Sequence, residues 1–277
     1  MRSVDMFTLA AVAAVCSCGG TPPGHAEAPR LVVLGPSLAE LACEGGLEDL
    51  VCGVDRYTVW PPSIDSLPRL GGYLDPSLEA LAALNPTDVL SVGHSAEMES
   101  LCGLVGARYR SFGFDTYEDI IAACESLETI WGADLSEFRE GLESTLDSIR
   151  LSVGADGPRV AVVVWHEPGD GVVTLAGHGT WYDDLFSRMG MELVAPRAGT
   201  YPAVSVEGVL SLAPDRILHL FPGMAGDSIS IIEAERGFWT RSAFPPERVL
   251  FAFEDHVMIP GARLALTARR FGELCGS

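Results

Sequence analysis

Short hydrophobic runs alternate with amphipathic segments along most of the chain. The runs are residues 31–34, 51–54, 89–92, 159–165 and 249–252. Each has the length of a buried strand, and most are followed by apolar residues at helical spacing. Strands that alternate with helices predict an α/β fold with mostly parallel sheets, whose ligand crevice lies at the carboxyl ends of the strands.

Two stretches of this pattern are near copies of each other. Residues 73–90 and 201–218 align without a gap at a constant offset of 128. In each copy a serine precedes a short helical segment with a glutamate in its first turn, Glu79 or Glu207, and a proline then separates the helix from a strand. The repeat predicts two similar Rossmann-like lobes.

A longer amphipathic segment separates the two copies. Apolar residues recur at steps of three and four from Leu135 to Val153, and Asp134 with Glu137 is expected to cap this helix. The helix would be roughly 28 Å long, which suits a stiff connector between lobes. The predicted division is an N-terminal lobe at 30–115, interlobe helices at 116–155 and a C-terminal lobe at 156–277. A second capping box is expected from Ser37 and Glu40, in the first helix.

The N-terminus is typical of an export signal. Residues 6–15 form an apolar run too short to span a membrane, followed by small residues and two cysteines. This pattern predicts a lipoprotein signal at 1–18, with Cys18 lipidated, and a flexible tether at 19–29. We therefore expect an exported domain, periplasmic or on the cell surface, held at a membrane by a lipid anchor.

The amino-acid composition limits the kinds of partner and chemistry that we expect for this chain. The net charge of −20 disfavours nucleic acid, and all 18 basic side chains are arginine, so P-loop and Schiff-base lysine chemistry is excluded. The five cysteines beyond the signal show no metal-ligand spacing, so no structural metal site is expected. No resident cofactor is expected either.

The ordered set of motifs resembles one protein family. The motifs are RLVVLGPSLAELACEGG at 30–46, VWPP at 59–62, the two serine–glutamate–proline repeats, AGHGTWYDDLFSRMG at 176–190 and PGAR at 260–263. They are similar to those of the substrate-binding proteins of ABC importers for cobalamin, haem and ferric siderophores, and most similar to the cobalamin-binding branch. The resemblance covers nearly the whole mature chain. It implies two lobes joined by a backbone helix, a ligand cleft between them, and delivery of the ligand to a membrane permease.

The resemblance also implies roles for individual residues. Glu79 and Glu207 would dock onto arginines of the permease, one from each lobe, although a first-turn glutamate is also favoured by the helix dipole. Aromatic cleft residues would contact the ligand, since flat rings bury a macrocycle well. They are Tyr57, Trp60, Tyr73, Trp181 and Tyr201. Ordinary core packing is the alternative, above all for the two tryptophans. The family's disulfide to Cys275 is not expected here, because its partner position falls near Met189.

The histidines do not decide which ligand the protein binds. His94, His166, His178 and His256 all follow predicted strands, where the crevice should lie. One of them could ligate haem iron or cobalt, and several could hold a bare metal ion, but none has paired ligand spacing. Haem therefore remains an alternative to cobalamin, with His94 and His256 as first candidates. Separate polar loop residues are the simpler interpretation.

Two further alternatives are disfavoured. Ferric siderophores are often anionic and would need clustered arginines, which the acidic loops do not offer. An α/β hydrolase would need a nucleophile elbow, and Gly93-His94-Ser95-Ala96-Glu97 has glutamate where the second glycine is required. We therefore expect a binding protein and not an enzyme.

Overall fold

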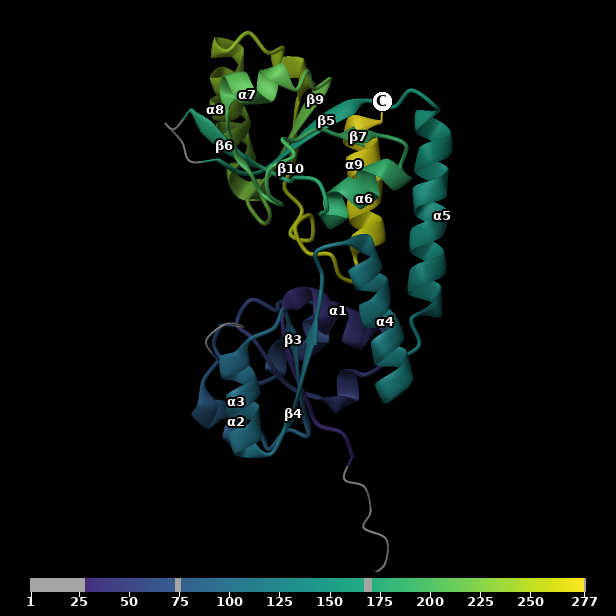
Figure 1. Ribbon diagram of the computed structural model, residues 1–277, viewed down its shortest axis with the longest axis vertical. Coiled ribbons are helices and arrows are strands. Elements are labelled where there is room, and N and C mark those ends of the chain that lie inside the picture. Colours follow the sequence, from purple (N-terminus) through teal and green to yellow (C-terminus); the bar gives the residue numbers. More distant parts are fainter. Residues whose placement is uncertain (1–27, 73–75, 167–170, 277) are drawn as a thin grey trace, which may run out of the picture.

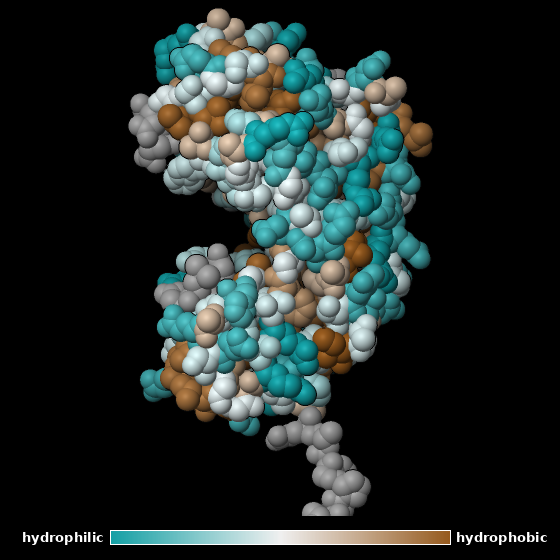
Figure 2. Space-filling model, in the orientation of Figure 1, coloured by the Kyte–Doolittle hydropathy of each residue, from teal (hydrophilic) through white to brown (hydrophobic). Residues whose placement is uncertain are grey.

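The computed structural model describes residues 28–72, 76–166 and 171–276. Two α/β lobes, each with its own sheet, lie at opposite ends of the molecule (Figure 1). Helices run along one side and connect the lobes, while the opposite side is open. The space-filling view shows a deep hollow between the lobes on that open side (Figure 2).

The N-terminal lobe is built on a parallel sheet. Its strands are β1 (Leu31–Leu34), β2 (Val51–Val54), β3 (Asp88–Val92) and β4 (Arg108–Phe112), in the order β2-β1-β3-β4. Helices α1 (Pro36–Glu44) and α4 (Tyr117–Trp131) cover one face, and α2 (Leu78–Leu84) and α3 (Ala96–Val105) cover the other (Figure 1). Side chains of β1 alternate between the two faces, and all four are fully buried, as expected of a strand covered on both sides.

The C-terminal lobe has a mixed sheet that is parallel at its centre. Its strands are β5 (Arg159–His166), β6 (Val172–Leu175), β7 (Glu192–Leu193), β8 (Ala203–Ser205), β9 (Arg216–Leu220) and β10 (Val249–Ala252). The order is β10-β9-β5-β6-β8, and β7 also pairs with β5. Only β6 runs antiparallel to its neighbours, β5 and β8.

Helices flank this second sheet on both sides. They are α6 (Trp181–Arg188), α7 (Val206–Ser211), α8 (Ser228–Arg241) and α9 (Leu264–Cys275). Short 3-10 helices occur at η1 (Glu48–Leu50), η2 (Pro62–Ser66), η3 (Ala225–Asp227) and η4 (Pro246–Arg248). In Figure 1, α7 and α8 lie toward the open side of the molecule, whereas α6 and α9 lie toward the connecting helices.

One long helix, α5 (Ser136–Val153), links the lobes (Figure 1). It packs against α9, and its buried residues Phe138, Leu142 and Leu146 belong to a hydrophobic cluster that extends from β1 to β9. The core is therefore continuous through both lobes and the helical side. This continuity argues for a stiff connection between the lobes, as the sequence predicts.

The duplicated segments form the same structure in both lobes. Ser77 and Ser205 accept hydrogen bonds from the backbone amides of Ala80 and Gly208, and so cap α2 and α7. Each helix leads to a parallel strand, β3 or β9. This prediction from the repeat is confirmed within the described residues, which in the first copy begin again at Pro76.

Two predicted helix starts are wrong. At α1 the N-cap is Gly35, and Pro36 occupies the first turn without any side-chain cap. Glu40, which was expected to close a capping box with Ser37, instead reaches the other lobe. Helix α5 begins at Ser136, not at Asp134, because the Asp134 carboxylate accepts from the amide and hydroxyl of Ser136 in a turn before the helix.

The cysteines of the described chain are free thiols, and Cys275 is buried among the residues of α5 and β9. Burial raises the pKa of the Cys275 thiol to about 12. Among the described helices, none combines the length and apolar character needed to cross a bilayer.

Candidate ligand-binding cleft

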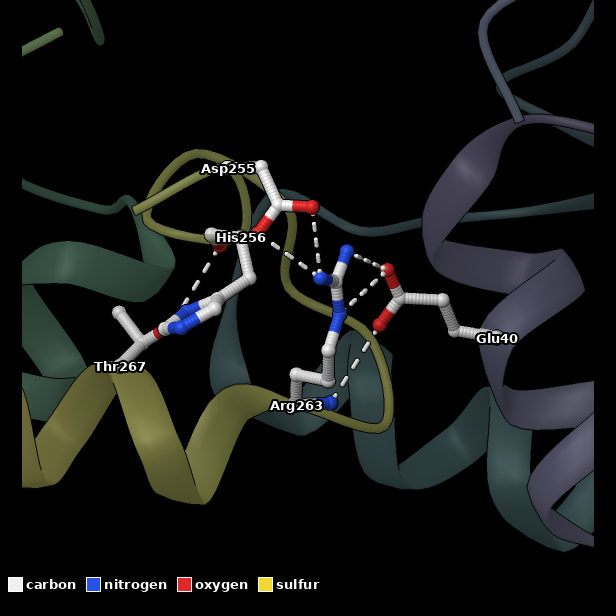
Figure 3. A network of polar contacts seen from close by, with 5 residues as sticks. All are labelled: Glu40, Asp255, His256, Arg263 and Thr267. Atoms are coloured by element: carbon white, nitrogen blue, oxygen red, sulfur yellow. Dashed lines mark hydrogen bonds and ion pairs between the residues drawn. The ribbon is translucent and has the colours of Figure 1, made fainter. Parts of the chain in front are cut away.

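The two lobes meet at the floor of the cleft through a buried ion pair. Arg263, at the start of α9, donates from Nη2 and Nε to Oε1 of Glu40 on α1, at 2.7 and 3.2 Å (Figure 3). Its Nη1 donates to both carboxylate oxygens of Asp255 at 2.9 Å. Glu40 and Arg263 side chains are 1% and 9% exposed. This network joins the first helix of one lobe to the last helix of the other.

Burial and the contacts with Arg263 act in opposite directions on the carboxyl pKa values of this network. It raises the pKa of the Glu40 carboxyl, and outweighs the opposing effect of Arg263. Burial alone would also raise the pKa of Asp255, but there the contacts with Arg263 prevail and the pKa is lowered. His256 lies beside the network, with Nδ1 2.9 Å from the Thr267 hydroxyl, and burial followed by the charge of Arg263 lowers its pKa (Figure 3).

Trp60 extends this junction toward the N-terminal lobe. Its ring lies 5.0 Å from the guanidinium carbon of Arg263, within the range of a cation–π contact. The structure therefore brings two of the predicted ligand-binding residues, Trp60 and His256, to the interlobe junction through Arg263. Trp60 is partly exposed, whereas His256 is buried.

Tyr57 lies in the loop that follows β2, in the N-terminal lobe, and is 55% exposed. Buried Asp55 shapes its loop by accepting from the amides of Gly35 and Tyr57, each at 2.7 Å, and from the Thr58 hydroxyl at 2.6 Å. The loop geometry also requires Gly35, whose φ is 120° and whose Cβ would lie 2.4 Å from a methyl of Val92. Sequence reasoning singled out Tyr57 but missed Asp55, which positions it.

Tyr201 lies in the loop before β8, in the C-terminal lobe, and is 47% exposed. Its loop is fixed by Gly177, whose amide donates to the Thr200 carbonyl at 2.7 Å and whose Cβ would lie only 2.7 Å from the same oxygen. The AGHG motif is thus explained by close backbone approach. Burial, with a further contribution from Asp115, raises the pKa of Tyr201.

Trp181 does not reach the surface. It is 3% exposed and stacks on Tyr182, with ring centroids 3.7 Å apart. Its amide donates to the Asp115 carbonyl at 2.5 Å, where the chain leaves the N-terminal lobe. Trp181 is therefore a buried packing residue beside the segment that leaves the N-terminal lobe, as expected if its role is in the core.

His94 and His178 lie on the exposed surface. His94 contacts Glu99 at 4.0 Å, and His178 contacts Asp183 at 3.2 Å. Ser95, of the elbow-like segment, caps α3 by accepting from the Met98 amide at 3.2 Å. Neither histidine meets the other predicted site residues in these contacts. Tyr73 and Cys18 lie outside the described residues.

A pocket of about 530 Å³ opens in the C-terminal lobe, at the carboxyl ends of β5 and β9 and beside α8. This is the edge of the sheet at which α/β folds bind ligands. Its apolar lining includes Trp165, Phe221, Met224, Ile231 and Met258. Met258 belongs to the loop that carries Asp255 to Arg263, so the pocket adjoins the interlobe junction.

His166 lies in the wall of this pocket and is almost fully buried. Its Nδ1 is 2.8 and 2.9 Å from the two carboxylate oxygens of Glu235 on α8. His219 lies behind it, with Nε2 accepting from the Trp239 indole at 2.7 Å, and burial lowers the pKa of His219 to about 3. Glu235 and His219 had no signal in the sequence that linked them to His166.

The described residues contain no group of three or more histidine, cysteine, aspartate or glutamate side chains arranged to hold a metal ion. Exposed rings at the lobes and the apolar pocket are suited to a large, partly flat organic molecule.

Two α/β lobes, a connecting helix and a hollow between them define a two-lobed fold. Residues 133–227 match a family model described as periplasmic binding protein. The vitamin B12-binding protein of Vibrio cholerae is 25% identical over 202 residues, which cover 69% of this chain and 70% of that protein.

Solved structures show the same fold. The periplasmic vitamin B12-binding protein of Vibrio cholerae superposes with a TM-score of 0.69 at 19% identity, covering 88% of this chain and 95% of that one. A periplasmic haem-binding protein of Pseudomonas aeruginosa has a TM-score of 0.72 at 22% identity, covering 89% and 92%. This chain is therefore similar to periplasmic binding proteins, in sequence over residues 133–227 and in fold over most of its length.

Proposed function

We propose that this chain is the extracytoplasmic substrate-binding protein of an ABC importer, and that it captures cobalamin or a related metal chelate between its lobes. The observation that carries the proposal is the hollow between the lobes, together with the apolar pocket of the C-terminal lobe. The exposed rings of Tyr57 and Tyr201 are proposed to add flat surface for the ligand. Relatives named as vitamin B12-binding proteins support cobalamin as the first candidate.

Haem is the second candidate. The buried imidazole of His166 in the pocket favours it, because an imidazole nitrogen is a common axial ligand of haem iron. A ferric siderophore is less suited to the site, since Arg263 at the cleft floor is already bonded to two carboxylates and the net charge is −20. The function proposed here includes no catalytic step.

A titration tests this function directly. The protein lacking only residues 1–18, which precede the described fold, is titrated separately with cyanocobalamin and with iron(III) protoporphyrin while tryptophan fluorescence is followed. We expect micromolar or tighter binding of at least one of them, with quenching from Trp60 and Trp165 near the cleft. Binding of neither chelate would contradict the proposed function.

Delivery to a permease is proposed to use one acid on each lobe. Glu79 and Glu207 are exposed in the first turns of α2 and α7, in equivalent places of the two lobes. The variant Glu79→Arg/Glu207→Arg should keep its ligand affinity and lose uptake by cells that depend on this protein. The control is Glu97→Arg/Glu247→Arg, which makes the same change in charge at other exposed acids. Equal uptake by both variants would remove the docking role.

Attachment to the membrane is proposed to occur through lipidated Cys18. Cells expressing Cys18→Ser should release the protein into the soluble fraction, whereas the unchanged chain stays with membranes. Mass spectrometry of the mature N-terminus identifies the lipid. Membrane retention of the Cys18→Ser variant would contradict lipidation at this residue, and Cys16→Ser is the matched control.

A further inference from the structure

The pocket of the C-terminal lobe is enclosed by several different elements of the fold. Val164 comes from the end of β5, Phe221 follows β9, Ile231 lies on α8 and Met258 belongs to the loop before α9. Its volume of about 530 Å³ is in the usual range for a site that takes a small molecule or part of a larger one. Because strand, helix and loop each supply a wall, the pocket is a built part of the lobe.

The ionisable side chains of the described lining are bonded within the wall. They are His166, His219 and Glu235, with side chains 3%, 1% and 8% exposed. His166 Nδ1 lies 2.8 Å from Glu235 Oε2, and His219 Nε2 accepts from the Trp239 indole at 2.7 Å. The described lining therefore presents no exposed charge to a group that enters the pocket.

This lining determines what kind of group is stable inside the pocket. A charged group would lose its hydration and gain no charged partner from the described lining, which is strongly unfavourable. An apolar group has no such loss. Its affinity should rise about fourfold for each CH₂ group removed from water, which corresponds to about 0.8 kcal/mol. The pocket therefore favours an uncharged, apolar group.

The mouth of the pocket is also apolar. Trp165, Met224 and Met258 line the pocket and are 64%, 44% and 37% exposed, so they lie where it meets solvent. Large apolar side chains that are exposed together are typical of a surface that a ligand covers. Methionine side chains are unbranched and adapt to partners of different shape. The mouth is therefore suited to groups that differ in shape.

The position of the pocket relates it to the space between the lobes. Met258 lies on the same loop as Asp255 and Arg263, and Arg263 pairs with Glu40 of the N-terminal lobe (Figure 3). A chelate held between the lobes at this junction would lie beside the pocket. A whole cobalamin is larger than about 530 Å³, so only a part of such a ligand can enter.

We propose that this pocket is a subsite for an uncharged, apolar substituent of the chelate, and that Ile231 and Met258 are specificity-determining residues of the subsite. The inference rests on the proposed function and specifies its ligand. The ligand is a chelate with an alkyl-type group on its metal or at the edge of its macrocycle, and its charged substituents stay outside the pocket. Affinity for the substituent comes from burial of apolar surface, and no bond to the protein is formed or broken.

Two series of chelates test the preference. In the first, the cobalt of cobalamin carries a methyl, n-propyl or 2-carboxyethyl group, and the last two are similar in size but differ in charge. In the second, the edge of an iron(III) porphyrin carries ethyl groups (mesoporphyrin) or hydroxyethyl groups (haematoporphyrin). We expect the propyl form to bind about tenfold more tightly than the methyl form, and the carboxyethyl form to bind no more tightly than the methyl form. The ethyl porphyrin should bind at least about fourfold more tightly than the hydroxyethyl porphyrin.

A pair of fluorescent dyes tests the pocket without a chelate. N-phenyl-1-naphthylamine is uncharged, and 8-anilino-1-naphthalenesulfonate has the same ring system with a negative charge. We expect the uncharged dye to bind the protein at least about tenfold more tightly, with a blue shift of its emission.

Variants assign these effects to the pocket. Ala234 is exposed on α8 and lines the pocket, so Ala234→Trp should fill it without loss of folding, as circular dichroism can verify. This variant should lose dye binding and the preference within each series. Met258→Gln, which is polar but similar in shape, should weaken binding of the propyl form at least about fivefold, whereas Met258→Leu should keep it. Ala83→Trp, at an exposed alanine of α2 in the other lobe, is the control and should behave as the unchanged protein.

The outcomes separate this inference from the proposed function. If a chelate series binds with equal affinities throughout, and Ala234→Trp changes nothing, the subsite is overturned while the proposed function stands. If neither series binds but the uncharged dye does, the proposed function fails and only the preference of the pocket for apolar groups is supported. Tighter binding of the sulfonated dye would contradict that preference. If Ala234→Trp abolishes binding of every chelate, the comparison of Met258→Gln with Met258→Leu decides, and equal affinities of these two variants for the propyl form would overturn the subsite.

Discussion

Arg263 Nη2 lies 2.7 Å from Oε1 of Glu40, a residue 223 positions earlier in the chain. Both side chains are buried, and they belong to different lobes. Interaction between two buried charges repays the loss of hydration only when the geometry is good and other hydrogen bonds are satisfied. Here the backbone amide of Arg263 and the Asp255 carboxylate supply these additional contacts. The pair therefore helps fix the position of one lobe against the other.

Removing one partner of this pair should be costly. Arg263→Met leaves the Glu40 carboxyl buried without its partner, so we expect the free energy of unfolding to fall by about 3 kcal/mol. The double variant Glu40→Met/Arg263→Met should recover most of that loss, because no buried charge remains. Urea unfolding followed by circular dichroism measures both.

An exposed ion pair provides the comparison. Arg159 and Glu192 interact at 3.2 Å with side chains 39% and 62% exposed, and Glu192→Gln should cost less than about 1 kcal/mol. If Arg263→Met cost no more than Glu192→Gln, the interlobe pair would not contribute to stability in the way described here.

Gly261 lets the loop before α9 approach α1. A Cβ at this position would lie 2.6 Å from Oε2 of Glu40, closer than real Cβ contacts allow. Gly261→Ala should therefore displace the loop and lower the free energy of unfolding by about 1 to 3 kcal/mol. Gly226→Ala, where no atom lies within 4 Å, should change stability by no more than about 0.5 kcal/mol. Equal effects of the two changes would refute the close-approach explanation.

Stability should depend on pH through His219. Burial lowers its pKa from 6.5 to about 3, so between these values the unfolded chain binds a proton at this ring that the folded protein does not. The free energy of unfolding then falls as the pH drops from about 6.5 toward 3, by up to about 1.4 kcal/mol for each pH unit.

The variant His219→Gln isolates this contribution. Its amide oxygen can still accept from the Trp239 indole, but it does not titrate. Urea unfolding at about pH 7 and about pH 5 should show a smaller loss in the variant than in the unchanged protein. His178→Gln, at an exposed histidine, should leave the loss as it is. An identical loss in the His219→Gln variant would contradict the buried neutral state of this ring.

Ligand binding should change the overall shape little. Helix α5, the continuous core and the Glu40–Arg263 pair all oppose a large hinge motion. Small-angle scattering with and without a bound chelate should give the same radius of gyration within error, corresponding to closure of a few ångströms at most. A clear compaction would show that these elements yield on binding.

Local and periodic features of the fold were predictable from the sequence. The two copies at 73–90 and 201–218 predicted the equivalent capped helices, because serine capping and proline termination act within a few residues. Where a local pattern competed with a distant partner, prediction failed: Glu40 has capping-box spacing but pairs with Arg263.

The site was predictable only in part, for the same reason. Tyr57 and Tyr201 could be proposed from their motifs, and the structure leaves both rings about half exposed, so their role in binding stays a prediction. His166 could be proposed because it follows a strand. Its partner Glu235 lies 69 residues later, on a helix whose sequence suggests no more than an amphipathic surface. When the fold brings together two residues that are distant in the chain, a single sequence contains no periodic pattern that links them.

The fixed position of the two lobes limits how a docking partner could distinguish the ligand-bound protein from the empty one. Glu79 and Glu207 stand on separate lobes, and the shared core with the Glu40–Arg263 pair holds those lobes at a set distance. The distance between the two carboxylates then stays the same whether the cleft is full or empty, and a docking partner would meet the same spacing of charges in both states. Under the proposed docking, a partner would detect the ligand only at the rim of the cleft, where the ligand itself becomes part of the exposed surface.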